Sequence, residues 1–523
     1  MWCRNLTVRY PDQDHAVLNN LTVSLRQRET TLLIGPSGSG KTTFLHVLAG
    51  LMPETIEAEV SGEWHADGTV GMLFQQPDDQ FCMQTVGAEI AFSLENRSIP
   101  RDEMEGRIRT VLKRVGLDLA LTAPIAELSG GMKQRLALAC VLALEPDILL
   151  LDEPTAQLDP HGCQVMMELI EELHHDPEVT LVLIEHQLEE CVTFADRVLV
   201  FWEGQVRIDG SPFDIFEEKR EELTRHGIMS PLLYPYTLET IPPEVATARF
   251  LDGSPVARRP LAHETTFDLT DVTITHGKRV ILDRISLTAS AGEWIMLVGR
   301  NGAGKSTLLE TLAKLLPAQS GMIKLFQTPL KKWRDRTFYR QVGFVFQQPE
   351  FQFLKQTVTD ELVISSPSPV QSHVADALQH YRLADVATQS PLALSLGQKR
   401  RLSVATMLLE RKAVLLLDEP TFGQDAETTA QILDVLHQAR ETGTTLIMVT
   451  HDMELVHRYA DRVVVIGEKH IQFDGTPDEL FRNESLLEHN QLIRPVSVRY
   501  QQLRGGASPC RKTTRCSHAL IRP

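Results

Sequence analysis

The 523-residue sequence lacks any apolar run that approaches the ~18 residues of a membrane-spanning helix. Its longest apolar runs, which end at Asp152 and Asp418, have the length of single strands. The N-terminal sequence Met-Trp-Cys-Arg-Asn also lacks the apolar centre of a signal peptide. We therefore expect that any membrane-spanning segments this protein works with belong to other chains.

The sequence contains fewer basic than acidic residues and few cysteines. Lys and Arg number 52 against 69 Asp and Glu, which gives a net charge of −17. This balance argues against nucleic acid as the main partner, because phosphate binding favours a basic face, although a local basic patch stays open. The 7 cysteines form no pattern of a disulfide-stapled fold, so we expect a reducing, cytoplasmic compartment.

Four sequence blocks occur twice, in the same order and at nearly constant spacing. They are GPSGSGKTT (35–43) and GRNGAGKST (299–307), FQQP (74–77 and 346–349), LSGGMKQR (128–135) and LSLGQKRR (394–401), and LLLDEPT (149–155 and 415–421). The pattern indicates a duplicated domain and not a solenoid, since each unit of about 230 residues is large enough to fold alone.

Composition suggests where the domains end. Six prolines fall between residues 231 and 260, which favours an extended linker. The chain end is basic and contains Gly505 and Gly506, which is typical of a disordered tail. We place domain 1 at 1–230, a Pro-rich linker at 231–264, domain 2 at 265–495 and a basic, disordered tail at 496–523. A metal site of Cys510, Cys516 and His518 is disfavoured, because no second ligand cluster lies nearby in the sequence.

Each unit has the pattern of an α/β fold. The apolar runs at 30–35 and 294–299 predict buried parallel strands, and each leads through a Gly-rich turn into a helix with apolar residues at i, i+3 and i+4. Further apolar strands at 147–151 and 413–417 favour a largely parallel sheet. Ser129 and Ser395 are expected as N-caps of helices that reach to about 145 and about 410.

The Gly-rich turns carry the pattern GxxxxGK[ST] twice, which is a strong signal for phosphate binding. Backbone N–H groups of such a turn wrap phosphates, and the following helix N-terminus adds a favourable dipole. We expect Lys41 and Lys305 to contact the β- and γ-phosphates, and the Thr42 and Ser306 hydroxyls to bind Mg²⁺. The Asp-Glu pairs at 152–153 and 418–419 end strands whose carboxyl ends face these turns, where Mg²⁺ can compensate their charge.

Together with LSGGMKQR and LSLGQKRR, these motifs resemble those of the ATP-binding cassette (ABC) ATPases over almost all of both units. The resemblance implies an α/β fold of two P-loop ABC nucleotide-binding domains, each with a mostly parallel sheet core and an α-helical subdomain. It also implies an ABC-type ATPase that hydrolyses ATP with Mg²⁺. Glu153 and Glu419 match the catalytic bases of the family, and His186 and His451 match the switch histidines that contact the γ-phosphate.

The resemblance also implies the ligand residues. The expected Mg²⁺ set combines phosphate-loop hydroxyls, Q-loop glutamines and Walker B aspartates, namely Thr42, Gln75, Asp152, Ser306, Gln347 and Asp418. The expected ATP-binding set takes in an adenine-stacking tyrosine, both phosphate loops, the glutamines and the signature residues. It comprises Tyr10, Gly35, Pro36, Ser37, Gly38, Ser39, Gly40, Lys41, Thr42, Thr43, Gln75, Ser129, Gly130, Gly131, Gly299, Arg300, Asn301, Gly302, Ala303, Gly304, Lys305, Ser306, Thr307, Gln347, Ser395 and Gly397. Asp159 and Asp425 match the D-loop position.

Such domains work as a head-to-tail pair, with each ATP between one domain's phosphate loop and the other's signature. Both halves lie on one chain here, so the pairing can be internal. The second signature has Leu396 where the family has glycine, and a bulky residue beside Ser395 can obstruct close approach to the γ-phosphate. We expect two sites of unequal turnover, the faster one pairing Lys305 and Glu419 with Ser129.

The stretches at 74–96, 346–362 and 422–425 resemble the ATPases of energy-coupling factor (ECF) importers. This resemblance implies a peripheral subunit on the cytoplasmic face of the cell membrane. It would power uptake of a vitamin, its precursor or a metal ion through a transmembrane coupling protein and a substrate-binding membrane protein. Asp78, Asp79 and Glu350 are then expected to meet basic residues of the coupling helices, or else are solvated loop acids. Fused ATPases of this kind are associated with thiamine-precursor uptake among others.

Two other tandem classes are less compatible with the residues. Sugar importers usually carry altered catalytic motifs in the second copy, whereas both copies are intact here. Cassettes that act on ribosomes typically have a long, charged helical linker, whereas this linker is Pro-rich. A soluble tandem ATPase that acts on ribosomes or another macromolecular complex remains the alternative.

Overall fold

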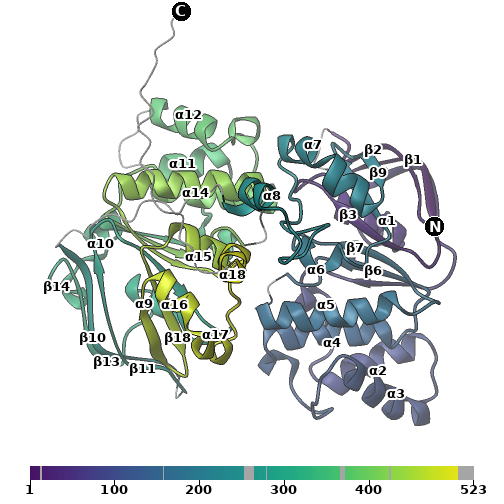
Figure 1. The fold of residues 1–523 in the computed structure, drawn as a ribbon, viewed down its shortest axis with the longest axis horizontal. Coiled ribbons are helices and arrows are strands. Elements are labelled where there is room, and N and C mark those ends of the chain that lie inside the picture. The colour runs from purple at the N-terminus through teal and green to yellow at the C-terminus, as the bar shows by residue number, and fades with distance from the viewer. Residues whose placement is uncertain are drawn as a thin grey trace, which may run out of the picture.

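Two six-stranded sheets form the cores of the chain (Figure 1). The computed structural model describes residues 1–11, 15–156, 158, 160–251, 264–277, 279–365, 371–422, 424 and 426–504. In domain 1 the strand order is β5 (Val70–Leu73), β6 (Ile148–Asp152), β7 (Thr180–Ile184), β3 (Thr30–Ile34), β8 (Arg197–Trp202) and β9 (Gln205–Gly210). In domain 2 it is β15 (Val342–Val345), β16 (Val414–Asp418), β17 (Thr445–Val449), β12 (Trp294–Val298), β18 (Arg462–Gly467) and β19 (His470–Gly475).

The expected parallel sheets are confirmed, with one antiparallel strand at an edge of each. Every pairing from β5 to β8 and from β15 to β18 is parallel, whereas β9 and β19 run antiparallel to their neighbours. All five residues of β3, β6 and β7 are buried, as are those of β12, β16 and β17. This burial explains their unbroken apolar runs, since parallel strands are covered on both faces.

A smaller antiparallel sheet covers one face of each core. In domain 1 it consists of β2 (Leu18–Ser24), β1 (Trp2–Arg9) and β4 (Glu59–His65), and in domain 2 of β11 (Arg279–Ser290), β10 (Thr265–His276), β13 (Ser320–Leu325) and β14 (Thr328–Pro329). The phosphate-loop helices α1 (Lys41–Leu48) and α9 (Lys305–Leu312) pack between the two sheets, because Phe44 of α1 belongs to the same buried cluster as Leu6 and Leu150. Each Gly-rich turn is thereby fixed between a buried strand and a buried helix.

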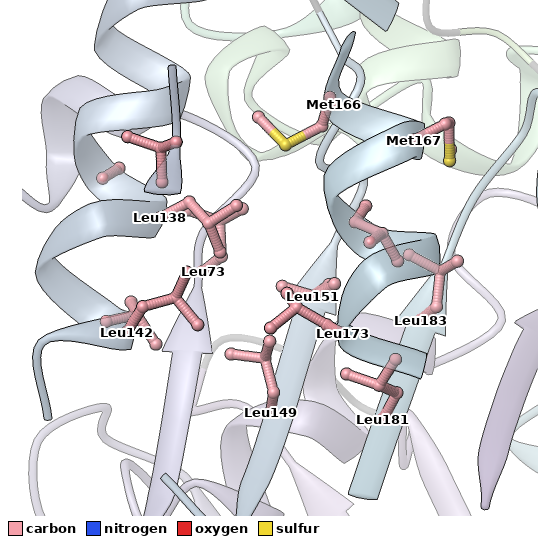
Figure 2. Packing of buried hydrophobic residues seen from close by; sticks show 14 of the residues in the cluster. Leu73, Leu138, Leu142, Leu149, Leu151, Met166, Met167, Leu173, Leu181 and Leu183 are labelled. Carbon is pink, nitrogen blue, oxygen red and sulfur yellow. The ribbon is translucent and has the colours of Figure 1, made fainter. Parts of the chain in front are cut away.

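Helices cover the other face of the core sheets. In domain 1, Leu138 and Leu142 of α4 (Gly130–Leu142) and Leu173 of α5 (Pro160–His174) lie beside the leucines of β5, β6 and β7, as Figure 2 shows. The helical subdomains consist of α2 (Val86–Asn96), α3 (Arg101–Arg114) and α4 in domain 1, and of α11 (Val358–Ser365), α12 (Gln371–His380) and α13 (Leu396–Leu408) in domain 2. The helix that follows each signature therefore rests directly on the sheet that carries the Asp-Glu pair.

The predicted N-caps are confirmed. The Ser129 hydroxyl accepts a hydrogen bond from the Met132 N–H at 3.3 Å, and the Ser395 hydroxyl accepts one from the Gln398 N–H at 3.3 Å. In domain 2 the Gln398 side chain also accepts from the Ser395 N–H, which completes a capping box. Both helices end two to three residues before the predicted positions, at Leu142 and Leu408.

The extended linker expected after residue 230 is wrong for the part that the structure describes. Residues 231–251 include α8 (Pro243–Ala246) and a further helical turn, Thr247–Leu251. The disorder expected from residue 496 is also wrong at its start, because residues 496–503 form α18 (Val496–Leu503). Leu238, Ile241 and Ala246 are buried together with Tyr500 of α18, and apolar burial is what holds these segments in place.

The linker and α18 are attached at corresponding points of the two domains. The Glu189 carboxylate on α6 (Leu188–Cys191) accepts the N–H groups of Leu232 and Leu233. The Glu454 carboxylate on α15 (Met453–Tyr459) accepts the Ser497 hydroxyl at 2.9 Å. The linker start therefore belongs to the fold of domain 1, much as α18 belongs to domain 2.

Some predicted features lie outside the described residues. These are 252–263 of the linker, 505–523 of the tail with Cys510, Cys516 and His518, and the D-loop residues Asp159 and Asp425. Within the described ranges, none of the helices combines the length and apolar character needed to cross a membrane.

Candidate active sites

Each phosphate loop closes around its own lysine. Lys41 Nζ donates to the backbone oxygens of Gly35 at 2.8 Å and Pro36 at 3.0 Å. Lys305 Nζ makes the same two bonds in domain 2, at 2.7 and 2.9 Å, to Gly299 and Arg300. The ammonium groups are thus held inside the loops, where a phosphate chain wrapped by the loop would meet them.

Glycine is required at the first position of both loops. A Cβ at Gly35 would lie 2.2 Å from the backbone oxygen of Phe201, and a Cβ at Gly299 would lie 2.1 Å from that of Ile466. Both glycines also have φ near +140°, a region that other residues rarely adopt. The sheet strand β8 or β18 therefore supports each loop directly from behind.

In each domain, the hydroxyl group expected to bind Mg²⁺ is hydrogen-bonded to the expected aspartate. Thr42 Oγ1 donates to Asp152 Oδ1 at 3.3 Å, and Ser306 Oγ donates to Asp418 Oδ1 at 3.1 Å. Burial raises the pKa of Asp152 to about 7 and the pKa of Asp418 to about 6. Buried carboxylates of this kind gain from a nearby cation, and hard oxygen ligands suit Mg²⁺, so the residues present fit the ion.

The catalytic glutamates lie between the Q-loop and the switch loop. Glu153 Oε1 lies 3.0 Å from His186 Nε2 in hydrogen-bonding geometry, and its Oε2 accepts from Gln75 Nε2 at 2.6 Å. Burial opposes ionisation of Glu153, but the His186 hydrogen bond and charge outweigh it and lower the pKa of this carboxyl. Its backbone has φ +48°, a strained conformation that is common at functional sites.

Domain 2 repeats this arrangement with a looser fit. Glu419 has φ +49°, and Gln347 Nε2 donates to its Oε2 at 3.5 Å. His451 Nε2 lies 2.9 Å from Glu419 Oε1 but outside hydrogen-bonding geometry. The two sites therefore contain the same residues in different alignment.

The remaining expected ATP ligands lie around these centres. Tyr10, just after β1, shares a hydrogen bond of 3.2 Å with the Thr43 hydroxyl, which places its ring beside the first phosphate loop. The signature residues Ser129 and Ser395 start the helices α4 and α13. Leu396 is 39% exposed at the start of α13, so its side chain is available to a facing surface.

The two domains are arranged head to tail in the view of Figure 1. The helical subdomain of domain 2, with α11 and α12, lies at the same end as the β1–β2 sheet of domain 1. The helices α2, α3 and α4 of domain 1 lie at the other end, level with the β10–β11 sheet of domain 2. The helical subdomain of each domain thus lies level with the small antiparallel sheet of the other in this view.

Two of the three acids expected to meet basic partner residues also form ion pairs within their own domain. Asp78 Oδ1 accepts from Lys133 Nζ at 2.6 Å, and Glu350 Oε1 accepts from Lys399 Nζ at 2.9 Å. Both lysines belong to the signature helices. Asp78 and Asp79 are exposed, and the role of these acids toward a basic partner stays a prediction.

Two polar residues near the sites were not predicted from the sequence. Glu185 is buried beside His186, and Arg400 is buried behind Gln347. Alignment of the two copies with each other could have found them, because IEHQ at 184–187 corresponds to VTHD at 449–452 and Arg400 corresponds to Gln134.

The profile of the ABC transporter family matches residues 18–156 and 282–422. These ranges hold both phosphate loops, both signatures and both Asp-Glu pairs. The chain belongs to the ABC family. As a tandem ABC ATPase, it hydrolyses ATP, and the family implies binding of ATP with Mg²⁺.

Relatives match almost the whole chain. The "Putative HMP/thiamine import ATP-binding protein YkoD" of Bacillus subtilis (strain 168) is 38% identical over 515 residues, which are 94% of each chain. A "Putative ABC transporter ATP-binding protein" of Methanosarcina mazei is 33% identical over 95% of this chain and 92% of its own. These matches extend the likeness beyond the motifs to the linker and both subdomains.

Among solved structures, the chain is similar to the archaeal ribosome recycling factor aABCE1, seen in complex with the ribosomal stalk protein aP1. The TM-score is 0.62, the sequence identity is 20%, and the match covers 96% of this chain and 98% of that one. At this identity the likeness shows the tandem α/β fold alone.

Proposed function

We propose that this tandem ABC ATPase is the energy-coupling subunit of an ECF-type importer and powers uptake of a thiamine-type vitamin or its precursor through separate transmembrane subunits. The observation that carries the proposal is an apolar docking surface directly after the second Q-loop. Phe351 is 72% exposed and Leu354 is 77% exposed, only four and seven residues after Gln347. Large exposed apolar side chains so close together mark a surface that a partner covers.

This surface is connected to the chemistry of its own domain. Gln347 touches the catalytic Glu419 at one end of the Q-loop, and Phe351 lies in the helical turn Pro349–Gln352 at the other. A membrane subunit that presses on Phe351 would therefore act within a few residues of the ATP site. The equivalent positions in domain 1 are the acidic Asp79 and Cys82, so we propose that the two domains dock chemically different helices.

The nature of the cargo is proposed from relatives. The relative with 38% identity over 94% of both chains carries the name of an HMP/thiamine import ATP-binding protein. Since the ATPase subunit does not itself carry cargo across the membrane, the identity of the cargo belongs to the membrane partner. We place the protein at the cytoplasmic face of the membrane, with no nucleic acid as partner.

In the proposed mechanism, the phosphate loops at 35–43 and 299–307 hold ATP, and Mg²⁺ supplies charge compensation for its phosphates. Thr42 with Asp152, and Ser306 with Asp418, which are already paired by hydrogen bonds, would hold the ion. Glu153 and Glu419 orient the attacking water and accept its proton. His186 fixes the Glu153 carboxylate from one side and Gln75 fixes it from the other.

The test is to purify the tagged full-length chain from its own cells in mild detergent and to identify what comes with it. We expect two small, highly apolar membrane proteins. The matched variant Phe351→Asp with Leu354→Asp should keep ATP binding but lose both partners, whereas Val363→Asp, exposed on α11 away from the Q-loop turn, should retain them. Ribosomal subunits in place of membrane proteins would overturn the proposal and favour the alternative of a ribosome-directed ATPase.

A further inference from the structure

Glu185 is a buried carboxylate that joins two loops of the first ATP site. It follows β7 directly and is 4% exposed. Its Oε1 accepts from the Thr155 N–H at 3.0 Å and from the Thr155 hydroxyl. Its Oε2 accepts from the N–H groups of His186 at 2.8 Å and Gln187 at 3.2 Å. Four donors from two separate segments thus converge on one side chain.

Each of these segments carries one member of the catalytic pair. Thr155 lies two residues after Glu153, and the Ala156 N–H donates back to the Glu153 backbone oxygen at 3.0 Å. His186 is the neighbour of Glu185 in the chain. The Glu185 carboxylate therefore links the turn that presents the base to the loop that presents the switch histidine.

Domain 2 is built differently at this point. The residue after β17 is Thr450, and its hydroxyl accepts from the Asp452 N–H at 3.1 Å, within the same loop. Asp452 in turn accepts the N–H groups of Glu454 and Leu455 and so caps α15. The second switch loop is thus braced to its own helix, whereas the first is braced to the turn after the Asp-Glu pair.

The two domains also differ in how the switch histidine is aligned with the catalytic glutamate. In domain 1, His186 and Glu153 form a hydrogen bond at 3.0 Å. In domain 2, His451 lies at a similar distance from Glu419 but outside hydrogen-bonding geometry. A buried carboxylate is costly unless it is fully hydrogen-bonded, so a side chain that takes four donors is suited to fix a geometry.

We propose that Glu185 is a positioning residue of the first ATP site, which holds His186 and Glu153 in register for hydrolysis. It acts through its hydrogen bonds to both loops, three of them from backbone N–H groups. The proposal rests on the catalytic roles assigned above to Glu153 and Glu419. The proposed role is confined to the first ATP site, because the equivalent residue in domain 2 is Thr450 and not an acid.

The experiment measures steady-state ATP hydrolysis of the full chain in two backgrounds. Glu419→Gln leaves turnover to the first site, and Glu153→Gln leaves it to the second. In the Glu419→Gln background, adding Glu185→Thr should lower kcat about 10- to 100-fold with KM for ATP nearly unchanged, since small misplacements of reacting groups have effects of this size. In the Glu153→Gln background, the same change should leave kcat within about twofold.

Glu190→Thr serves as the matched control, because it removes an exposed acid from the short helix α6 that follows the switch loop and should change neither parameter. If Glu185→Thr fails to fold, Glu185→Gln keeps the side-chain volume and one acceptor oxygen and should give a smaller loss at the first site only. Equal losses in both backgrounds, a change only in KM, or no loss would each overturn the proposal. A wrong assignment of the catalytic glutamates would give a different result. In that case the single variants Glu153→Gln and Glu419→Gln would already retain full activity, before Glu185→Thr is added.

Discussion

Arg400 Nη2 donates to the backbone oxygen of Gln347 at 2.6 Å, and its Nη1 donates to that of Phe346 at 2.7 Å. The signature helix α13 therefore holds the second Q-loop by its backbone. In domain 1 the equivalent residue is Gln134, which is also buried but whose Nε2 has no hydrogen-bond partner. The ion pairs Lys133–Asp78 and Lys399–Glu350 are common to both domains, so this guanidinium is the main difference in how the Q-loops are held.

Arg400→Gln, which copies domain 1, should lower the unfolding free energy by about 1–3 kcal/mol, because two backbone oxygens of the Q-loop lose a charged, buried donor. Burial lowers the pKa of Arg400 to about 10, so the guanidinium stays charged at neutral pH and the bonds are present there. Chemical denaturation of the purified chain measures the effect. Arg401→Gln is the control, since Arg401 Nη1 donates to the Thr428 hydroxyl and not to the Q-loop, and it should have a smaller effect. An equal loss in both variants would contradict this reading.

The catalytic glutamates should contribute unequally to total ATPase activity. We expect Glu419→Gln to remove the larger share, because the predicted head-to-tail pairing completes the site of Glu419 with the intact signature at Ser129. The hydrogen bond between His186 and Glu153 does not reverse this expectation. In the same pairing, the site of Glu153 would close against the signature that contains Leu396. Steady-state ATPase rates of the two single variants measure these shares. Equal losses of activity would contradict the prediction of unequal turnover.

Leu396→Gly should raise turnover at the first site. Glycine would restore the family's small residue beside Ser395 and permit closer approach of the helix start to the γ-phosphate. The gain should appear in the Glu419→Gln background as a several-fold rise in kcat, against a helix-stability cost of about 1 kcal/mol for glycine in place of leucine. Leu392→Gly, which alters an exposed leucine just before the signature, should not raise the rate. A rise with both variants would point to loosening of the subdomain instead.

The strands, the phosphate loops and the helix caps could be predicted from the sequence because each is encoded locally. An apolar run such as 148–151, a Gly-rich turn or a serine before a helix specifies its structure within a few residues. The linker could not be predicted, because Pro242 and Pro243 are equally typical of extended chain and of a helix start. What decides between them is burial of Ile241 against Tyr500, which lies 259 residues later in the chain.

The hydrogen bonds of Glu185 could not be predicted from the sequence for a related reason. Glu185 precedes a switch histidine in a short loop, where an acid is ordinarily solvated. Its role depends on Thr155, which lies in the turn after a different strand, β6, and on the burial of its own side chain. Pairings between neighbouring parallel strands are set by topology, so one segment of sequence does not contain them.

The pH dependence of the apo protein should follow Asp152. Burial raises the pKa of this carboxyl from 3.8 to about 7, so the folded chain keeps the proton where the unfolded chain has released it. The unfolding free energy of the apo protein should therefore fall as pH rises from about 4 to about 7, and level off above that range. Mg²⁺ binds the ionised carboxylate, so its affinity at the first site should rise up to tenfold per pH unit below about pH 6 and level off as the pH passes about 7.

Asp152→Asn tests both effects at once, because it removes the buried charge and the Mg²⁺ ligand together. The variant should be more stable than the parent at pH 8 without nucleotide, and it should lose most of the stabilisation that Mg²⁺ with ATP gives the first site. Asp418→Asn should behave in the same way with its window shifted lower, since burial raises the pKa of Asp418 only to about 6. Thermal unfolding between pH 5 and 8, with and without Mg²⁺ and ATP, measures both effects. A parent protein whose apo stability rises across that range would show that Asp152 is ionised in the folded chain, and the raised pKa would have to be abandoned.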